Sequence, residues 1–366
     1  MNNRRNDLLS RMKDFVLGRG HQIGRLILGL VGCWSCLDVW GQRFSDIERY
    51  GAEMNSAQAE LLEQGLAKKS DDESARLQLY GYYGRYREIA GAFERRMEHA
   101  IWLIEHSPRC GLHRSSYAFF DREQHPEFFK RGKELWLAHI DRNPSDLAIM
   151  EYAGLFLRES DLEIAEALFQ RGYQAQPDEP RWPNNLGRLR LRAMKKADPG
   201  SEQRARSSAE ALDFFQQTYR LSVEHGKGML LPSLCQVALA SGRFSEAERY
   251  ARSMLLQEGA GSFGYQRNHY HGHTVMGVLK FDRGEYDEAK HLLMKSIDLP
   301  PSVSEMSNEP DLSLVRRFID KGDKAVAMAF FTACESIWKS GQDQLEEWQA
   351  KLERGQTIDF EHSPMY

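Results

Sequence analysis

The 366-residue sequence lacks the short motifs that organise most enzymatic sites. It contains no GxxxxGK[ST] phosphate loop, no HExxH zinc helix, no GxSxG nucleophile turn and no GxGxxG dinucleotide loop. Acidic residues are plentiful, but no pair of carboxylates stands out as the acid and base of a substrate pocket. The sequence therefore predicts a non-enzymatic protein with no cofactor.

Cysteine is scarce, with five residues at positions 33, 36, 110, 235 and 334. Cys33 and Cys36 have the spacing of a metal or redox pair, but they lie in an apolar run and no second pair accompanies them. Cys235 and Cys334 fall at core positions of expected helices, where a free thiol behaves as a small apolar group. We expect neither a disulfide framework nor a cysteine metal site.

Long apolar runs are also absent, since none reaches the roughly 18 residues of a membrane-spanning helix. A shorter uncharged run, Leu26 to Leu37, follows a basic lead and precedes Gly41. This pattern is typical of a bacterial export signal cut after Gly41. The letters before Cys33 also resemble a lipobox, which would place a lipid on Cys33. We expect a periplasmic or membrane-anchored protein; the alternative is a cytoplasmic protein whose residues 1–41 pack on the fold as an amphipathic helix.

The chain has no excess of positive charge. Its net charge is −4, and removal of residues 1–41 would take away six basic and three acidic residues and leave −7. Because phosphate binding needs a basic face, this balance predicts no nucleic-acid partner. Membrane contact is expected only through a retained or lipidated N-terminus.

The most informative stretch is 270–301, YHGHTVMGVLKFDRGEYDEAKHLLMKSIDLPP. Its first half repeats large residues every three or four positions, which predicts an amphipathic helix. Gly284 supplies a break, because glycine readily adopts the positive φ that ends a helix. A second helical stripe follows from Tyr286. Small Gly277 and small Ala289 mark the point where the two helices can touch.

This spacing resembles the tetratricopeptide repeat, a family of helical hairpins of about 34 residues that stack into a superhelix. The small, aromatic and proline positions of that repeat correspond here to Gly277, Gly284, Tyr286, Ala289 and Pro301. No strand pattern appears in the sequence. The resemblance implies an all-α fold, an α-α superhelix or solenoid of antiparallel hairpins with atypical terminal caps.

Similar hairpins begin near Asp146, Pro180, Gly228 and Asn308. The second of them carries about twelve extra residues, Lys195 to Arg206, which we interpret as a mobile charged loop in the hairpin turn. The sequence predicts four regions. Residues 1–41 form the export signal or an apolar helix, and residues 42–145 form degenerate hairpins with a long loop at 110–126. The repeats span 146–340, and residues 341–366 form a capping helix and tail.

The resemblance implies that the first helix of each repeat lines a groove that binds a protein or peptide. Repeat two carries the most polar version of this face. Its arginines and asparagines suit an acidic segment or a chain-terminal carboxylate, because arginine presents a planar fork of donors. The predicted groove residues are Met150, Arg158, Arg181, Asn184, Asn185, Arg188, Arg192, Gln236, His271 and Phe281.

The sequence leaves two other functions open. A structural subunit of an envelope assembly would bind through its outer helices and its long loop. A metal-dependent enzyme would use the histidines that begin repeat four, of which His269 and His273 share a helix face. His273 falls at a repeat position that normally holds a core aromatic residue, so we predict no metal there. The sequence favours a binding scaffold or adaptor over both alternatives.

Overall fold

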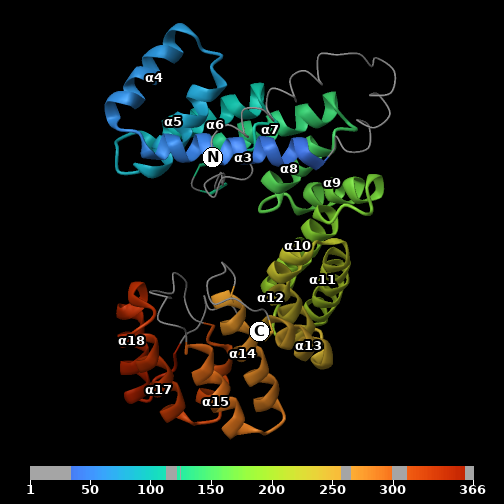
Figure 1. The fold of residues 1–366 in the computed structure, drawn as a ribbon, viewed down its shortest axis with the longest axis vertical. Helices are drawn as coiled ribbons and strands as arrows, with labels where there is room; N and C mark the ends of the chain where they lie inside the picture. The colour runs from blue at the N-terminus through green and yellow to red at the C-terminus, as the bar shows by residue number, and fades with distance from the viewer. Residues whose placement is uncertain (1–33, 113–121, 124, 257–264, 299–310, 359–366) are drawn as a thin grey trace, which may run out of the picture. The chain divides into compact units, whose positions relative to one another are not determined.

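The computed structural model describes residues 34–112, 122–123, 125–256, 265–298 and 311–358 (Figure 1). These residues form two compact units, divided after Asp161. The division falls inside the first expected repeat, after its first helix, whereas the sequence placed it at residue 146. The reason is that α8 (Leu147–Leu157) packs on α7 in unit 1, whereas α9 (Leu162–Ala175) packs on α10 in unit 2.

Unit 1, where the structure describes it, is built of α-helices. They are α3 (Trp34–Glu53), α4 (Ser56–Lys68), α5 (Glu73–Arg85), α6 (Ala92–His106), α7 (Pro126–Arg142) and α8. Side-chain caps define several starts: the carboxylate of Asp72 accepts from the amide of Ala75, and that of Asp146 accepts from the amides of Ala148 and Ile149. The assignment of this region to degenerate hairpins stays a prediction.

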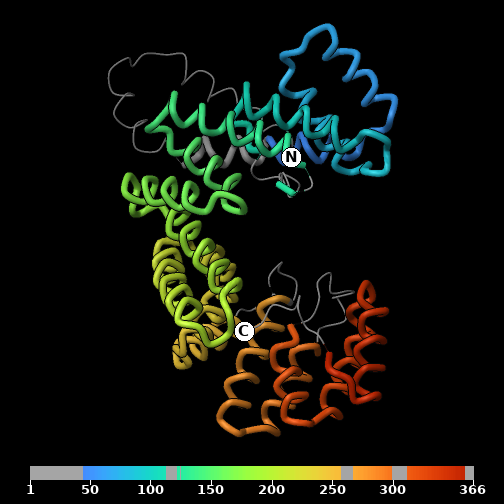
Figure 2. The backbone as a smooth tube through the Cα atoms, turned by 180° about the vertical axis from the view of Figure 1, so that it is seen from behind, coloured from blue at the N-terminus to red at the C-terminus, as the bar shows by residue number. Residues whose placement is uncertain are grey.

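Unit 2 continues as helical pairs from α9 onward. These are α10 (Arg181–Lys196), α11 (Glu202–Leu221), α12 (Glu224–Ala240), α13 (Phe244–Leu255), α14 (Tyr265–Asp282), α15 (Tyr286–Ser296), α16 (Ser313–Asp320), α17 (Lys324–Cys334) and α18 (Gln342–Glu353). Sequential helices pack on one another, and Figures 1 and 2 show α14, α15 and α17 side by side. Within the described ranges there is no strand. The prediction of an all-α solenoid of antiparallel hairpins is confirmed.

The last three hairpins turn at the same glycine position. Gly242, Gly284 and Gly322 have φ angles of 72°, 81° and 91°, and each lies two residues before the second helix of its hairpin. Only glycine takes this left-handed conformation at little cost. The break predicted at Gly284 is confirmed, and Gly242 and Gly322 form equivalent breaks. The predicted capping helix is present as α18, in which the side chains of Leu345, Trp348 and Leu352 are buried.

The helices of unit 2 cross at small residues. Ala247, Ala289 and Ala327 occupy the same place in three successive second helices, and each is completely buried. Gly277 faces the Ala289 crossing: a Cβ atom placed on Gly277 would lie 3.6 Å from the Ala289 carbonyl oxygen and 2.4 Å from Leu314 Cδ2. The close approach predicted for Gly277 and Ala289 is therefore present.

The extra residues of the second repeat do not form a loop. They lengthen both helices, so that α10 runs to Lys196, α11 begins at Glu202, and only 197–201 turn. Ser201 caps α11 by accepting from the amide of Arg204, and the guanidinium of Arg204 donates to the Met194 carbonyl oxygen at 3.1 Å. The predicted mobile excursion is wrong, because the added residues satisfy their polar groups within an extended hairpin.

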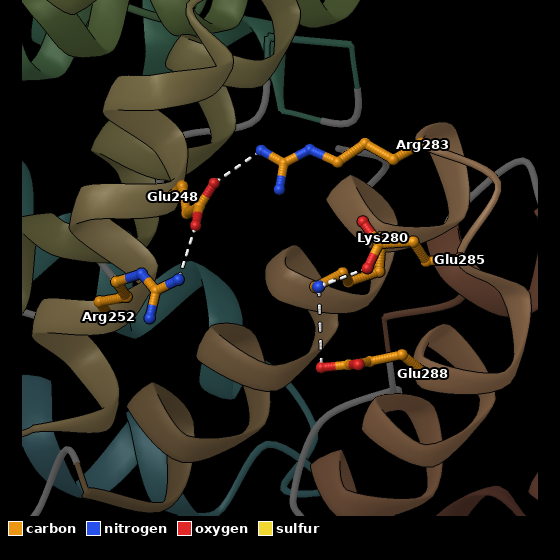
Figure 3. Close-up of polar contacts among 6 residues, drawn as sticks. All are labelled: Glu248, Arg252, Lys280, Arg283, Glu285 and Glu288. Carbon is orange, nitrogen blue, oxygen red and sulfur yellow. Dashed lines mark hydrogen bonds and ion pairs between the residues drawn. The ribbon is translucent and has the colours of Figure 1, made fainter.

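Ion pairs join the third and fourth hairpins at their surface (Figure 3). Glu248 of α13 accepts from Arg252 of the same helix and from Arg283 in the α14–α15 turn, both at 2.7 Å. Lys280 in turn contacts Glu285 at 2.5 Å and Glu288 at 3.8 Å. The two guanidinium groups lower the pKa of Glu248. Of these contacts, the pair of Glu248 and Arg283 joins the two hairpins, and the others lie within one hairpin.

Two sequence predictions concern segments that the structure does not describe. Residues 1–33, including Cys33, lie outside the described residues, and the proposed cut after Gly41 falls within the span of α3. Export, lipidation and packing therefore stay predictions. Most of the long loop, 113–121 and residue 124, also lies outside. Among the helices that are described, none is long and apolar enough to cross a membrane.

The helix crossing at Ala289 gives the first test of the fold. Ala289→Leu adds three carbons to a fully buried contact, so we expect the free energy of unfolding to fall by about 1 to 3 kcal/mol. Urea unfolding followed by circular dichroism measures it. Met294→Leu, at a partly exposed position of the same helix, is the control and is expected to change stability little. Equal stability of the two variants would contradict the described register.

Candidate partner-binding surface

Helix α10 is strongly basic. Its sequence, RWPNNLGRLRLRAMKK, holds six basic residues and no acidic one. Lys195 and Lys196 lie in the last turn, where positive charge is favoured by the helix dipole. The helix stops at Ala197, just before the Pro199–Gly200 turn, where Gly200 has a φ of 79°. Charge of one sign is therefore concentrated on a single helix of a chain that is acidic overall.

Most of this charge lies on one face of the helix. Five residues spaced three or four apart form the α10 basic stripe, which comprises Arg181, Asn184, Arg188, Arg192 and Lys195. Arg188 and Lys195 are exposed, and the other three are partly exposed. The opposite face carries Trp182, Leu186 and Leu189, which are buried. The core thus sets which side of α10 faces outward.

Arg190 points away from the stripe and has a structural role. Its guanidinium binds both carboxylate oxygens of Glu166 on α9, and its Nε lies 2.5 Å from Glu210 Oε2 on α11. These carboxylates raise the pKa of Arg190. The contacts hold α10 between its two neighbours and so fix the direction of the basic stripe.

The first turn of α10 is held by close packing. Trp182 is completely buried against α9, and a Cβ atom on Gly172 would lie 2.5 Å from its ring. Arg181 covers the Trp182 ring at 5.1 Å from its centroid and donates to Gln176 at 3.4 Å. The start of the stripe is thus tied to α9, whereas Arg188 near its middle is exposed.

Two amides at the start of α10 have unused hydrogen-bonding atoms. Asn184 Oδ1 and Asn185 Nδ2 are buried, and neither has a hydrogen-bond partner among the described residues. A buried polar atom without a partner costs about 1 to 3 kcal/mol, so such atoms are uncommon in folded proteins. Asn184 lies on the stripe, but its Oδ1 is buried and is not exposed to a partner.

The structure does not bring all predicted groove residues together. Asn185, Met150 and Gln236 are buried with exposures of 7%, 4% and 8%, so they offer little surface to a partner. Arg158 belongs to unit 1, where it lies 3.4 Å from Glu159. The position of a residue within its repeat was not enough to predict that its side chain is exposed, because some residues at groove positions are buried by their neighbours.

The two predicted residues of α14 differ in character. Phe281 packs edge to face on Phe318 and Tyr286, with ring centroids 5.0 and 5.1 Å apart, so it is mainly a packing residue. His271 is partly buried, and burial together with nearby Arg267 lowers its pKa to about 4. His271 is therefore neutral at pH 7 and adds no charge to the basic face.

The histidines that begin α14 are engaged in local contacts. Nδ1 of His273 lies 2.9 Å from the His269 carbonyl oxygen, and Nε2 of His269 lies 3.1 Å from the Lys295 carbonyl oxygen. Their rings are 4.3 Å apart. Across the residues that the structure describes, no group of three histidine, cysteine or acidic side chains is arranged to hold a metal ion.

The first and second helices of unit 2 differ in how many acidic residues they carry. The first helices α12 and α14 carry acidic residues only at their ends, Glu224 and Asp282. Arg267 of α14 lies against α12, with its Nη2 3.5 Å from the Met229 carbonyl oxygen. The second helices α11, α13 and α15 carry several acidic residues each. Basic residues equal the acidic ones in number on α11, α12, α13 and α15, so a large excess of positive charge is found on α10 and not on these neighbouring helices.

A buried carboxyl group lies near the end of the basic stripe. Asp311, directly before α16, is 1% exposed and interacts electrostatically with Lys195 and Arg317. Burial raises the pKa of Asp311 to about 7. The surrounding protein also lowers the pKa of Lys195, against the opposing influence of Asp311. Sequence periodicity gave no sign that Asp311 is buried.

Comparisons with known proteins identify no family for the chain. No family model matches it, and no curated protein matches it. A solved structure described as the human IFIT1 dimer with m7Gppp-AAAA matches with a TM-score of 0.45 and 12% identity, over 87% of this chain and 72% of the other. At that similarity the match assigns neither a family nor a partner to this protein.

The match nevertheless corrects one prediction. The structure of the human protein contains m7Gppp-AAAA, a nucleic acid, so the exclusion of nucleic acid made from net charge is wrong. The physical reason is that net charge sums the whole chain, whereas binding depends on local charge. A chain of net charge −4 can still present a helix with six cations, as α10 does.

Asp311 gives a pH test of the folded structure. Its folded pKa of about 7 lies above the ordinary value of 3.8, so the folded state binds more protons between these pH values and loses stability as pH rises through them. We expect wild-type protein to lose more stability than Asp311→Asn between pH 5 and pH 8 in urea unfolding. The same loss in both proteins would contradict the buried environment of Asp311.

Proposed function

We propose that the protein is a non-enzymatic scaffold that captures an acidic protein segment on the α10 basic stripe. The observation that carries this proposal is the cationic stripe itself, with Arg188 and Lys195 exposed on a helix that has no acidic residue. Arginine forks bind carboxylates in pairs of hydrogen bonds, which gives both affinity and orientation. An acidic segment, or a chain-terminal carboxylate, matches this chemistry.

The resemblance to tetratricopeptide repeats supports a scaffold role. The turns at Gly242, Gly284 and Gly322 and the buried alanines 247, 289 and 327 recur in register, as that family requires. We propose on this basis that unit 2 is a tetratricopeptide-like array. Such arrays leave the first helices of their hairpins open to a partner, and α10 is a first helix.

Charge reversal on α10 tests the proposed function. Arg188→Glu with Arg192→Glu replaces two cations of the stripe by anions, so we expect a histidine-free acidic peptide to bind at least about tenfold more weakly. Fluorescence anisotropy with labelled peptide measures the dissociation constant. Circular dichroism is expected to stay unchanged, because neither side chain belongs to the buried face of α10.

The matched control reverses the charge of two exposed arginines on α11, the helix that follows α10, with the double variant Arg206→Glu and Arg220→Glu. It changes the net charge by the same amount and is expected to leave peptide binding within about twofold. Equal weakening by both double variants would contradict a specific role for the stripe. A short single-stranded RNA that binds more tightly than the peptide, and loses binding in the α10 variant, would overturn the choice of partner class.

A further inference from the structure

The closing helix α18 is the most acidic helix that the structure describes. Its sequence, QDQLEEWQAKLE, holds four acidic residues and one basic residue. No other described helix has so large an acidic excess, and α10, with six basic residues and no acidic one, has the largest basic excess. The two extremes of charge among the described helices therefore lie on two helices of the same unit, unit 2.

The core fixes which side of α18 faces outward. Leu345, Trp348 and Leu352 are buried, and the Trp348 ring packs on Phe331 of α17 with the ring centroids 5.4 Å apart. The opposite side of the helix is exposed. Three exposed residues on that side form the α18 acidic stripe, which comprises Asp343, Glu346 and Glu353.

The carboxylates of the α18 acidic stripe are not used by the fold. Within the described part of the chain, none of the three takes part in a side-chain hydrogen bond or an ion pair. The other acidic residue of the helix, Glu347, lies 2.6 Å from Lys351, so a neighbouring cation balances its charge. The stripe therefore keeps its negative charge for a cationic surface.

The charges of the two stripes have the same spacing. On α10 the exposed cations Arg188 and Lys195 are seven residues apart, and on α18 the exposed Glu346 and Glu353 are also seven residues apart. Seven residues of α-helix rise by about 10 Å. Two such helices laid side by side, in either direction, can therefore form two ion pairs at once.

The fold of one copy keeps the two stripes on separate surfaces. Helix α10 packs on α9 and α11, whereas α18 packs on α17. The helices α12 to α17 lie between them in the order of packing. Because both stripes are exposed in the folded chain, a second copy can join them without any change in the packing of either copy.

We propose, on the basis of the function proposed above, that the acidic segment captured by the α10 basic stripe is α18 of a second copy of this chain. The two stripes are different surfaces, so the contact joins α18 of one copy to α10 of another. Exposed charges dominate this contact, and it involves one helix face from each copy. Association is therefore reversible and weakens as the salt concentration rises.

Sedimentation velocity of the full chain tests the proposal. The average mass of wild-type protein is expected to rise with protein concentration at about 50 mM salt and to return to that of the monomer at about 500 mM. Two double variants reverse the matched charges, Arg188→Glu with Lys195→Glu on α10 and Glu346→Lys with Glu353→Lys on α18. Each is expected to associate at least about tenfold more weakly than wild type.

The control for the α18 variant reverses two exposed acidic residues of α6, Glu94→Lys with Glu98→Lys. It makes the same change in net charge and is expected to associate within about twofold of wild type. Circular dichroism of all the variants is expected to match wild type, because every substituted side chain is exposed.

An equimolar mixture of the α10 and α18 double variants separates charge pairing from damage to the fold. The reversed α10 of one variant meets the reversed α18 of the other, and the two unchanged stripes also match. The mixture is therefore expected to associate within about fivefold of wild type, although neither variant does so alone. A variant that had failed to fold could not recover in this way.

Wild-type protein that stays monomeric while it binds the labelled acidic peptide would overturn the pairing of copies and leave the proposed function intact. Association that persists in both double variants, or a mixture that associates no better than its components, would overturn the pairing as well. Absence of both self-association and peptide binding in wild-type protein would overturn the pairing and the proposed function together.

Discussion

The structure depends on close contact between helices at small side chains. Ala247, Ala289 and Ala327 are completely buried at equivalent positions, and Gly277 has no room for a Cβ atom beside Leu314. Because interiors are packed as tightly as crystals, such contacts set the distance and rotation of each helix pair. The rotation of α10, fixed by Trp182 against Gly172 and by Arg190 between two carboxylates, then decides which residues of that helix are exposed.

Local charge, rather than total charge, defines the surface that results. Acidic residues of the second helices form ion pairs, such as those of Glu248, whereas α10 has no acidic residue. A basic face can therefore exist on an acidic protein.

Much of the fold could be predicted from the sequence, because helical periodicity and turn glycines are local signals. The positions of Gly284, Ala289 and the closing helix follow from spacing alone. The lengthened α10–α11 hairpin could not be predicted that way, since Lys195 to Arg206 looks like a loop until Ser201 and Arg204 are seen to complete its hydrogen bonds. The stripe was visible in part, but the burial of Met150 and Gln236 and the placement of Asp311 depend on contacts between distant residues.

The measurement that tests the central claim most directly is hydrogen exchange of the full chain, followed by mass spectrometry, with and without saturating acidic peptide. A partner held on the basic stripe should slow backbone exchange in fragments from α10, residues 181–196, because binding suppresses local opening. Fragments from α11, residues 202–221, should change much less. Protection confined to α11 and α13, or none at saturation, would contradict the assignment of the binding surface to α10.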